Sequence, residues 1–226
     1  MKKVAICIIS GGMDSALSAH IAKKEGYDIV AVHFNYGQKT QKKELDSFKK
    51  ISKDLNAIST HIIDLDFFKQ IGVNALTEDS IEIPTEGIKP GVPITYVPYR
   101  NGIFLSISAA LAQKYSAKAI YIGVVEEDSS GYPDCREDFI KAINKAIDLG
   151  LNDNSLTIET PLIHLSKAQI VKKAFEIGVK LEHTWSCYKN EDKACGLCDS
   201  CRLRLKGFKE AGIKDPIEYE TIPKEL

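Results

Sequence analysis

The sequence predicts an α/β protein with a doubly wound, mostly parallel sheet of about five strands and helices on both faces. Strand-like apolar runs alternate with helix-like amphipathic runs along most of the 226 residues, as in consecutive βα units. The first unit joins an apolar run at 4–9 to a helical run at 16–24 through Ser-Gly-Gly-Met-Asp-Ser at 10–15. A chain of this length can bury one sizeable core, so we expect a single domain over residues 1–226.

The loop at residues 10–15 has the composition of an anion-binding site. Gly11 and Gly12 permit a sharp turn and a close approach of the backbone to a ligand. Asp14 and Ser15 are residue types that cap helices, and the N–H groups and dipole of the new helix favour phosphate oxygens. A tight turn with an ordinary cap would have the same composition. The loop is not a Walker A loop, because no Gly-Lys-Ser/Thr follows, and it lacks the third glycine of a dinucleotide fingerprint.

The later elements follow from apolar periodicity and from the residues that interrupt it. Strands are expected at 29–34, 58–65, 119–125 and 156–160, and helices at 41–56, 103–115 and 136–149. Ser166 is expected to cap a further helix that ends at Gly178 and buries Ile170, Val171, Ala174 and Phe175.

Residues 66–100 show weak periodicity and contain four prolines. A stretch of this length without regular structure is uncommon in a compact domain unless it is functional. We expect a lid or a substrate loop.

The composition limits the partners that this chain can have. It has 30 basic and 31 acidic residues, so nothing points to a long nucleic-acid footprint. No apolar stretch has the length of a membrane span, and the first one is too short for a secretory signal. We therefore expect a cytoplasmic protein that acts on small molecules. His33, His61, His164 and His183 show no metal-binding spacing.

Four of the six cysteines lie close together as C-x7-C-x2-C-x2-C: Cys187, Cys195, Cys198 and Cys201. Four thiolates at this spacing suit a tetrahedral Zn²⁺ ion, which would be structural because no position stays open for water. An iron–sulfur cluster uses the same ligands and remains an alternative. Disulfides are disfavoured inside a cell. Cys7, within the first apolar run, is expected to be a small core residue, whereas Cys135 follows a polar turn and has either a structural or a substrate-binding role.

Several segments carry a resemblance to known families. Residues 10–15 resemble the SGGxDS loop of the PP-loop ATP pyrophosphatases. Further segments resemble the 7-cyano-7-deazaguanine synthases within that superfamily: Tyr36-Gly37-Gln38, residues 97–101, residues 127–136, Thr160-Pro161-Leu162-Ile163, residues 184–188 with the four cysteines, and Arg204, Gly207 and Phe208. The YPDCR and TWSCY segments are the most specific. Tyr99 departs from the family pattern, which has glycine at this position.

The resemblance implies an ATP-dependent reaction. A 7-carboxy-7-deazaguanine is adenylated, takes up ammonia to form an amide, and is activated again and dehydrated to the nitrile, on the route to queuosine or archaeosine. The implied cofactors are ATP with Mg²⁺ and one structural Zn²⁺, in a segment at about 184–212. The family also suggests a homodimer.

The resemblance also assigns residues to roles. ATP is expected at Ile9, Ser10, Gly11, Gly12, Met13, Asp14, Ser15 and Ala16. Asp14, Arg100 and Lys167 are the expected catalytic residues: Asp14 would position Mg²⁺ or cap the helix, and the two cations would neutralise the α-phosphate or the substrate carboxylate. A solvated surface charge is the competing interpretation for both cations. Tyr132, Asp134, Cys135 and Arg136 are the expected substrate-binding residues, with Asp134 accepting hydrogen bonds from the guanine-like edge.

Three other functions stay open from sequence. A tRNA-modifying PP-loop enzyme would usually add an RNA-binding domain or a persulfide cysteine. A zinc-stabilised module that binds nucleotide or RNA without catalysis fits the cysteines and Arg202, Arg204 and Lys206. A glutamine-dependent synthetase would need a glutaminase, so free ammonia is the simpler nitrogen source.

Overall fold

Five parallel strands form one sheet in the order β3-β2-β1-β4-β5. The structure is a computed structural model that describes residues 3–71, 73–87, 89–126, 131–152 and 155–224. The order reverses direction between β1 and β4, as in doubly wound folds, and this confirms the predicted fold class. The strands are β1 (Val4–Ile8), β2 (Asp28–Asn35), β3 (Ser59–Asp64), β4 (Ala119–Tyr121) and β5 (Thr157–Glu159).

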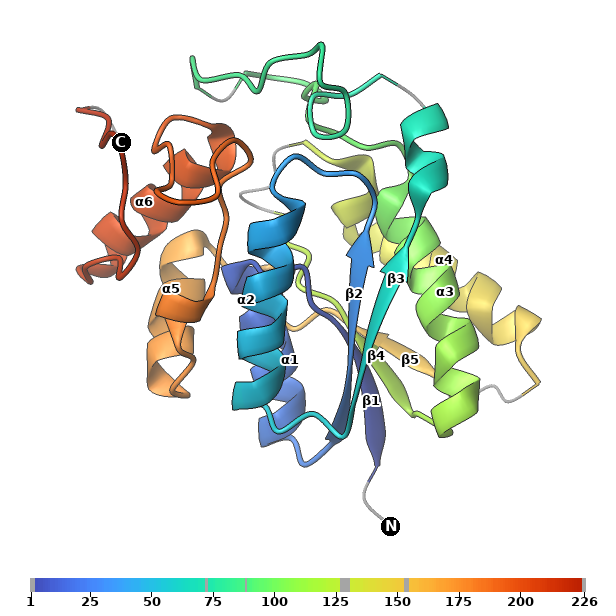
Figure 1. Ribbon diagram of the computed structural model, residues 1–226. Coiled ribbons are helices and arrows are strands. Elements are labelled where there is room, and N and C mark those ends of the chain that lie inside the picture. The colour runs from blue at the N-terminus through green and yellow to red at the C-terminus, as the bar shows by residue number, and fades with distance from the viewer. Residues whose placement is uncertain (1–2, 72, 88, 127–130, 153–154, 225–226) are drawn as a thin grey trace.

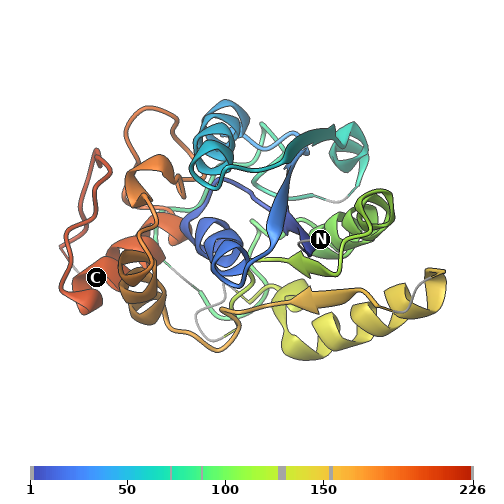
Figure 2. The same ribbon diagram turned by 90° about the horizontal axis from the view of Figure 1, so that it is seen from below.

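Helices cover both faces of this sheet. Figure 2, seen along the strands, shows α1, α2, α5 and α6 on one side and α3 and α4 on the other. The helices are α1 (Met13–Lys24), α2 (Gln41–Asp54), α3 (Arg100–Tyr115), α4 (Glu137–Gly150), α5 (Lys167–Glu176) and α6 (Asp199–Ala211), with short 3-10 turns at Asp66–Gln70, Pro133–Cys135 and Leu181–His183.

The inner strands β1, β2 and β4 are largely buried on both faces, because alternate residues contribute to two different cores. On β1, Ile6 and Ile8 pack towards α3 and α4, whereas Ala5 and Cys7 pack towards α1 and α2. Cys7 is fully buried there, as its sequence context predicts. His33 is also a core residue, and its Nδ1 atom pairs with the carbonyl oxygen of Ile9.

Three expectations about the helices need correction. The helix after the first loop begins at Met13, so Gly12 is its N-cap and Asp14 and Ser15 lie inside its first turn. Phe175 is 51% exposed, because the buried stripe of α5 consists of Ile170, Val171 and Ala174 and the next residue falls beside it. Helix α6 was not predicted as a helix at all. Ser166 does cap α5, in a capping box with Gln169.

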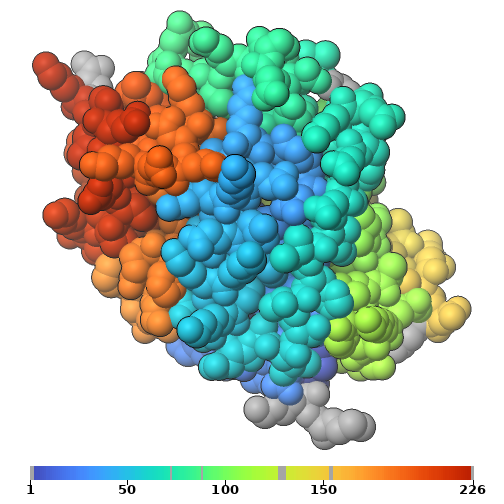
Figure 3. Space-filling model, viewed as in Figure 1, coloured from blue at the N-terminus to red at the C-terminus, as the bar shows by residue number. Residues whose placement is uncertain are grey.

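Residues 66–100 pack on the core, so the description of this stretch as weakly structured was only partly right. Phe68, Leu76, Ile83 and Val97 are all buried in it. In Figure 1, the part from residue 73 onward crosses above the carboxyl ends of β2 and β3, where a cover over a binding site would lie. Its Thr85 carbonyl accepts a hydrogen bond of 3.1 Å from Arg202. The space-filling view shows the resulting contact between this segment and the C-terminal part of the chain (Figure 3).

Across the residues whose placement is described, no helix combines the length and the apolar character needed to cross a membrane.

Candidate functional site

A cavity of about 240 Å³ opens at the carboxyl edge of the sheet, where β1 and β4 diverge. Ligands bind at this switch point in doubly wound folds. Ile8 and Ile9 line it from the end of β1, and Ile122, Gly123 and Val124 line it from beyond β4. The fold therefore brings the loop at 10–15 and residues from eight other segments of the chain to one place.

The loop at 10–15 leads into α1 and leaves the N-terminus of this helix accessible. Gly11 has a φ of +98°, a conformation that glycine adopts at little cost. No side chain caps the helix, so N–H groups of its first turn remain available for an anion. The Ser10 and Ser15 hydroxyl oxygens lie 3.1 Å apart, and Ser15 also donates to the Gly12 carbonyl. Of the eight residues expected to bind ATP, six line the cavity: Ile9, Ser10, Gly12, Met13, Asp14 and Ser15. Gly11 and Ala16 stand behind them.

Gly123 allows the end of β4 to touch the start of α1. A Cβ atom at this position would lie 2.6 Å from both the Asp14 carbonyl carbon and the Ser15 nitrogen. Gly123→Ala should therefore displace the first turn of α1 and weaken ATP binding at least about tenfold, since overpacking costs about 1–3 kcal/mol. Equilibrium binding of an ATP analogue measures this. Gly150→Ala is the matched control, because a Cβ there meets nothing within 4 Å; equal losses in both variants would contradict the prediction.

Asp14 and Lys167 form an ion pair inside the cavity. Lys167 Nζ lies 2.5 Å from Asp14 Oδ2, and the side chains are 12% and 27% exposed. Lys167 is the first residue of α5, and Gly207 of α6 packs against its Cβ, where a Cβ on Gly207 would lie at 2.7 Å. Asp14 Oδ1 is buried and has no hydrogen-bond partner among the described residues. The pair leaves one carboxylate oxygen for a bound cation.

Arg100 lies among aromatic side chains on the opposite side of the cavity. Its Nη1 donates to the Tyr36 hydroxyl at 2.9 Å, and its guanidinium stands 5.2 Å from the centre of the Tyr36 ring. Phe34 and Phe104 stack with their centres 4.2 Å apart. Tyr132, Tyr188 and Trp185 complete this lining. Flat aromatic surfaces and a guanidinium suit a planar, anionic heterocycle.

The four expected substrate-binding residues divide into two pairs. Tyr132 and Cys135 line the cavity, whereas Asp134 and Arg136 do not. Asp134 is 3% exposed, and its Oδ2 accepts the Asn101 N–H at 2.9 Å in the first turn of α3. Burial raises the pKa of this carboxyl. Its contacts are those of an acceptor for a helix N-terminus rather than of a reader of the substrate edge. The neighbouring segment at 127–130 lies outside the described residues.

Cys135 is a shielded thiol. Burial raises its pKa to about 12, and the nearby Asp134 charge adds to the effect. Asn101 Nδ2 lies 3.3 Å from its sulfur. A thiol that stays protonated at neutral pH contributes shape and weak polarity to the cavity, not a nucleophile.

Tyr99 occupies a left-handed backbone conformation with a φ of 57°. This explains why the family resemblance has glycine there, because glycine takes this conformation without a Cβ penalty. The tyrosine ring covers Gly102 and meets Phe139 edge to face at 5.6 Å. This packing offsets a backbone cost of about 1 kcal/mol.

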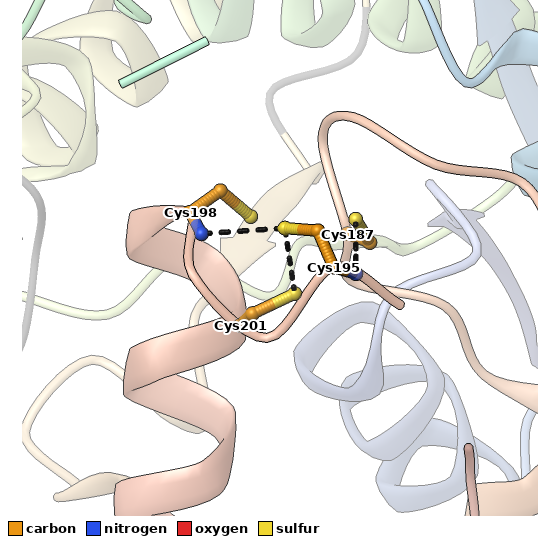
Figure 4. Close-up of side chains that lie close together, drawn as sticks. All are labelled: Cys187, Cys195, Cys198 and Cys201. Carbon is orange, nitrogen blue, oxygen red and sulfur yellow. Dashed lines mark hydrogen bonds between the residues drawn. The ribbon is translucent and has the colours of Figure 1, made fainter. Parts of the chain in front are cut away.

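The four cysteines meet as one cluster at the start of α6 (Figure 4). All four sulfurs lie within 4.8 Å of one another and are buried, and Cys195 and Cys201 are 3.9 Å apart. Sulfurs bonded to one tetrahedral Zn²⁺ at about 2.3 Å would be separated by about 3.8 Å. Backbone N–H groups of Cys195, Lys189 and Asn190 point at the Cys187 sulfur, and such donors favour the thiolate form. The donor set fits a tetrahedral metal.

Arg204 joins the cysteine cluster to the rest of the C-terminal segment. Its guanidinium forms a two-pronged pair with Asp215 at 2.7 and 2.9 Å, and the two side chains are only 1% and 6% exposed. It also donates to the Thr184 hydroxyl and to the Leu181 carbonyl. The adjoining tail turns back here, and the Tyr219 hydroxyl donates to Asp215.

Arg204→Met should therefore lower the free energy of unfolding by about 3–5 kcal/mol, because it leaves Asp215 buried without its counter-charge. Chemical denaturation measures the change. Lys206→Met is the control: its pair with Glu210 is exposed and long, at 3.8 Å, and its loss should cost less than about 1 kcal/mol. A small effect at Arg204 would mean that Asp215 finds other partners.

Glu44, Phe104, Trp185 and Tyr188 line the cavity although the sequence did not single them out as site residues. In the family resemblance, Trp185 and Tyr188 entered only as members of the segment at residues 184–188, without a role of their own. Glu44 lies on a lysine-rich helix, where a glutamate is normally a solvated residue. The sequence signal that could have identified Glu44 is its closeness to the family segment Tyr36-Gly37-Gln38. The side chains of Gln38 and Thr40 both donate hydrogen bonds to the Glu44 carboxylate.

The comparison with known proteins identifies relatives along nearly the whole chain. A family model described as "Queuosine biosynthesis protein QueC" matches residues 4–212. A protein of Sulfurovum sp. (strain NBC37-1) named 7-cyano-7-deazaguanine synthase is 64% identical over 97% of this chain and 99% of its own length. A protein of the same name from Aliarcobacter butzleri (strain RM4018) is 63% identical over 96% of each chain.

Among solved structures, a 4-thiouridine synthetase in complex with RNA and bound ATP has a similar fold. The TM-score is 0.53 at 20% identity, over 93% of this chain and 50% of that one. This chain therefore spans about half of the synthetase, and the similarity concerns the fold.

Proposed function

Because the chain belongs to the QueC family of queuosine biosynthesis proteins, we propose that it converts 7-carboxy-7-deazaguanine and ammonia to 7-cyano-7-deazaguanine with consumption of ATP. The observation that carries this proposal is the identity of 58–64% with enzymes named 7-cyano-7-deazaguanine synthase, over nearly the full length of each chain. The cavity supplies a physical account of the reaction.

A carboxylate resists attack by a nitrogen nucleophile, because its leaving group would be oxide. Adenylation replaces that leaving group by AMP. The loop at 10–15 would hold the β- and γ-phosphates with the N–H groups of α1, and Lys167 would balance charge on the α-phosphate. Asp14 Oδ1, which is buried and has no hydrogen-bond partner in the described part of the chain, fits a role in holding the Mg²⁺ that accompanies ATP. Positioning of the reacting atoms supplies much of the acceleration.

The aromatic side of the cavity would take the deazaguanine. Tyr132, Tyr188 and Phe104 offer surfaces for the flat ring system, and Arg100 lies where it can meet the substrate carboxylate. The amide product can be adenylated on its oxygen in the same position, and loss of AMP and a proton then gives the nitrile. One site thus serves both steps.

The cysteine cluster would hold one Zn²⁺ with a structural role, since four thiolates leave no position for water or substrate. We also propose that two copies of the chain form a symmetric homodimer, as the family resemblance implies. The nitrogen source is free ammonia in this proposal, and the enzyme acts on the free base without contacting nucleic acid or membrane.

Turnover followed by mass spectrometry tests the function. The protein receives Mg-ATP, ammonium and 7-carboxy-7-deazaguanine, and we expect the nitrile as base product and AMP as nucleotide product. AMP without nitrile would favour another adenylating enzyme of this superfamily, such as one that modifies tRNA. A folded, metal-loaded protein that binds ATP but releases no AMP would favour a non-catalytic nucleotide-binding module.

A further inference from the structure

We propose that the Glu44 carboxylate is the catalytic base that takes protons from the nitrogen during both chemical steps, and that it forms the subsite where ammonia is held beside the activated carbonyl. The inference rests on the proposed function and adds to it a residue to which no role has been assigned.

The first support is position. Glu44 lies in the first turn of α2 and lines the same cavity as Ser10, Arg100 and Lys167. Its backbone touches the phosphate-binding loop, since a Cβ on Gly11 would lie 2.7 Å from the Glu44 carbonyl oxygen. The Glu44 backbone therefore lies against the loop, and its side chain shares one cavity with the expected phosphate site and with Arg100. This is the cavity in which an adenylated carbonyl would be held.

The second support is the way the carboxylate is held. Thr40 Oγ1 donates to Oε1 at 2.8 Å, and Gln38 Nε2 donates to Oε2 at 3.1 Å. Gln38 is itself fixed, because its Oε1 accepts the Tyr36 N–H at 2.8 Å. Each carboxylate oxygen has one donor and retains acceptor capacity. Among the described residues, no lysine or arginine forms an ion pair with Glu44, and the residue lines the cavity.

The third support is the protonation equilibrium. Burial raises the pKa of Glu44 to about 7, while the Thr40 and Gln38 hydrogen bonds and the Arg100 charge oppose the rise and the Glu191 charge adds to it. Among the described residues, the other titratable side chains that line the cavity are Asp14, Tyr36, Arg100, Tyr132, Cys135, Lys167, Tyr188 and Arg204. Burial raises the pKa of Tyr36. A base with a pKa near the working pH is the most effective. A glutamate with an ordinary pKa would accept a proton from nitrogen less readily.

The proton balance defines two uses of this base. In the first step the ammonia nitrogen bonds to the adenylated carbon, the carbon–oxygen bond to AMP breaks, and the proton released by the new nitrogen substituent passes to Glu44. In the second step the amide oxygen displaces pyrophosphate from a second ATP, and one amide N–H proton passes to solvent. The resulting O-adenylated amide, with its nitrogen doubly bonded to carbon, loses its remaining N–H proton to Glu44 as AMP leaves and the nitrile forms. Glu44 returns each proton to solvent between steps. ATP and ammonia are the only co-reactants required.

Glu44→Gln tests the inference, because the amide keeps the size of the side chain and cannot accept a proton. Exchange of labelled pyrophosphate into ATP, in the presence of 7-carboxy-7-deazaguanine and without ammonia, needs no base and should stay within about threefold of the wild type. Nitrile formation from either the acid or the amide should fall about 10²-fold. For nitrile formation from the amide, which uses no ammonia, the wild-type rate should rise with pH through about 7 as Glu44 loses its proton, and the variant should lack this limb.

Glu191→Gln is the matched control. The Glu191→Gln substitution removes the same charge near Glu44. Glu191 accepts the Lys42 and Lys43 N–H groups and does not line the cavity. Its turnover should stay within about twofold of the wild type. Equal loss of exchange and nitrile formation in Glu44→Gln would overturn the inference in favour of a structural or ATP-binding role, as would an unchanged rate and pH profile. Absence of exchange in the wild type would instead be a failure of the proposed function.

Discussion

Lys167→Met is expected to lower the rate of AMP formation about 10³-fold in a protein that remains folded. Lys167 places a positive charge within 2.5 Å of Asp14 in the loop at 10–15, which we propose binds the phosphates. Such a charge stabilises the transition state more than the ground state, because negative charge grows on the α-phosphate and the leaving pyrophosphate, and removing one such group costs about 10²–10³-fold or more. Initial rates at saturating ATP measure the loss in kcat.

Two comparisons separate this role from a structural one. Lys172→Met removes an exposed lysine from the same helix and should leave the rate unchanged. The double variant Lys167→Met with Asp14→Asn removes the carboxylate charge that the single variant leaves unpaired. If the rate recovers in the double variant, the loss came from the unpaired Asp14; if it stays low, Lys167 acts on the reaction. A single variant within about threefold of the wild type would reduce Lys167 to a solvated charge.

Cys198→Ser should abolish binding of one equivalent of metal and lower the free energy of unfolding by at least about 4 kcal/mol. Four-thiolate zinc sites contribute about 10–16 kcal/mol of binding free energy to small domains, which sets the scale. In a chain of this size the loss corresponds to a fall in Tm of about 8–16 °C. Elemental analysis and thermal unfolding measure the two effects, and extraction by a strong chelator should reproduce the fall in the wild type.

Cys7→Ala is the control for a buried cysteine outside the cluster. Cys7 packs in the sheet and contacts none of the other sulfurs, so its replacement should retain the metal and cost about 1 kcal/mol. Zinc in the elemental analysis would support a structural Zn²⁺ ion, whereas iron together with visible absorption would indicate an iron–sulfur cluster. A fully stable, metal-free Cys198→Ser protein would contradict a structural role for the site.

The sheet and most helices were predictable because their signals are local. An apolar run of β1 type, or the amphipathic spacing of α2, depends on the segment alone. Helix α6 was missed because Arg204 stands on its buried face and interrupts the apolar stripe. The buried arginine is tolerated only because Asp215 and the Leu181 carbonyl accept its hydrogen bonds. Such tertiary partners cannot be recognised from the periodicity of the sequence.

In the candidate site too, features that depend on contiguous residues were predictable, whereas features that depend on tertiary contacts were not. The loop at 10–15 was found because its glycines and capping residues are contiguous. Around the 3-10 turn that begins at Pro133, contiguous residues face different ways. Tyr132 and Cys135, three residues apart, line the cavity, whereas Asp134 between them accepts the N–H of Asn101 at the start of α3. Glu44 was missed because its function depends on burial by segments remote in sequence. Orientation and burial are tertiary properties that one sequence does not display.

The close contact between Gly207 and Lys167 bears on the order in which a newly made chain becomes competent. The ribosome releases the phosphate-binding loop early, and α5, which carries Lys167, follows long afterwards. Helix α6 packs on α5 at Gly207 and begins beside the cysteines. The packing of Gly207 against Lys167 is therefore complete only after residues 199–211 have been made. A chain that still lacks this last helix already possesses the loop at 10–15 but not the support of its cation.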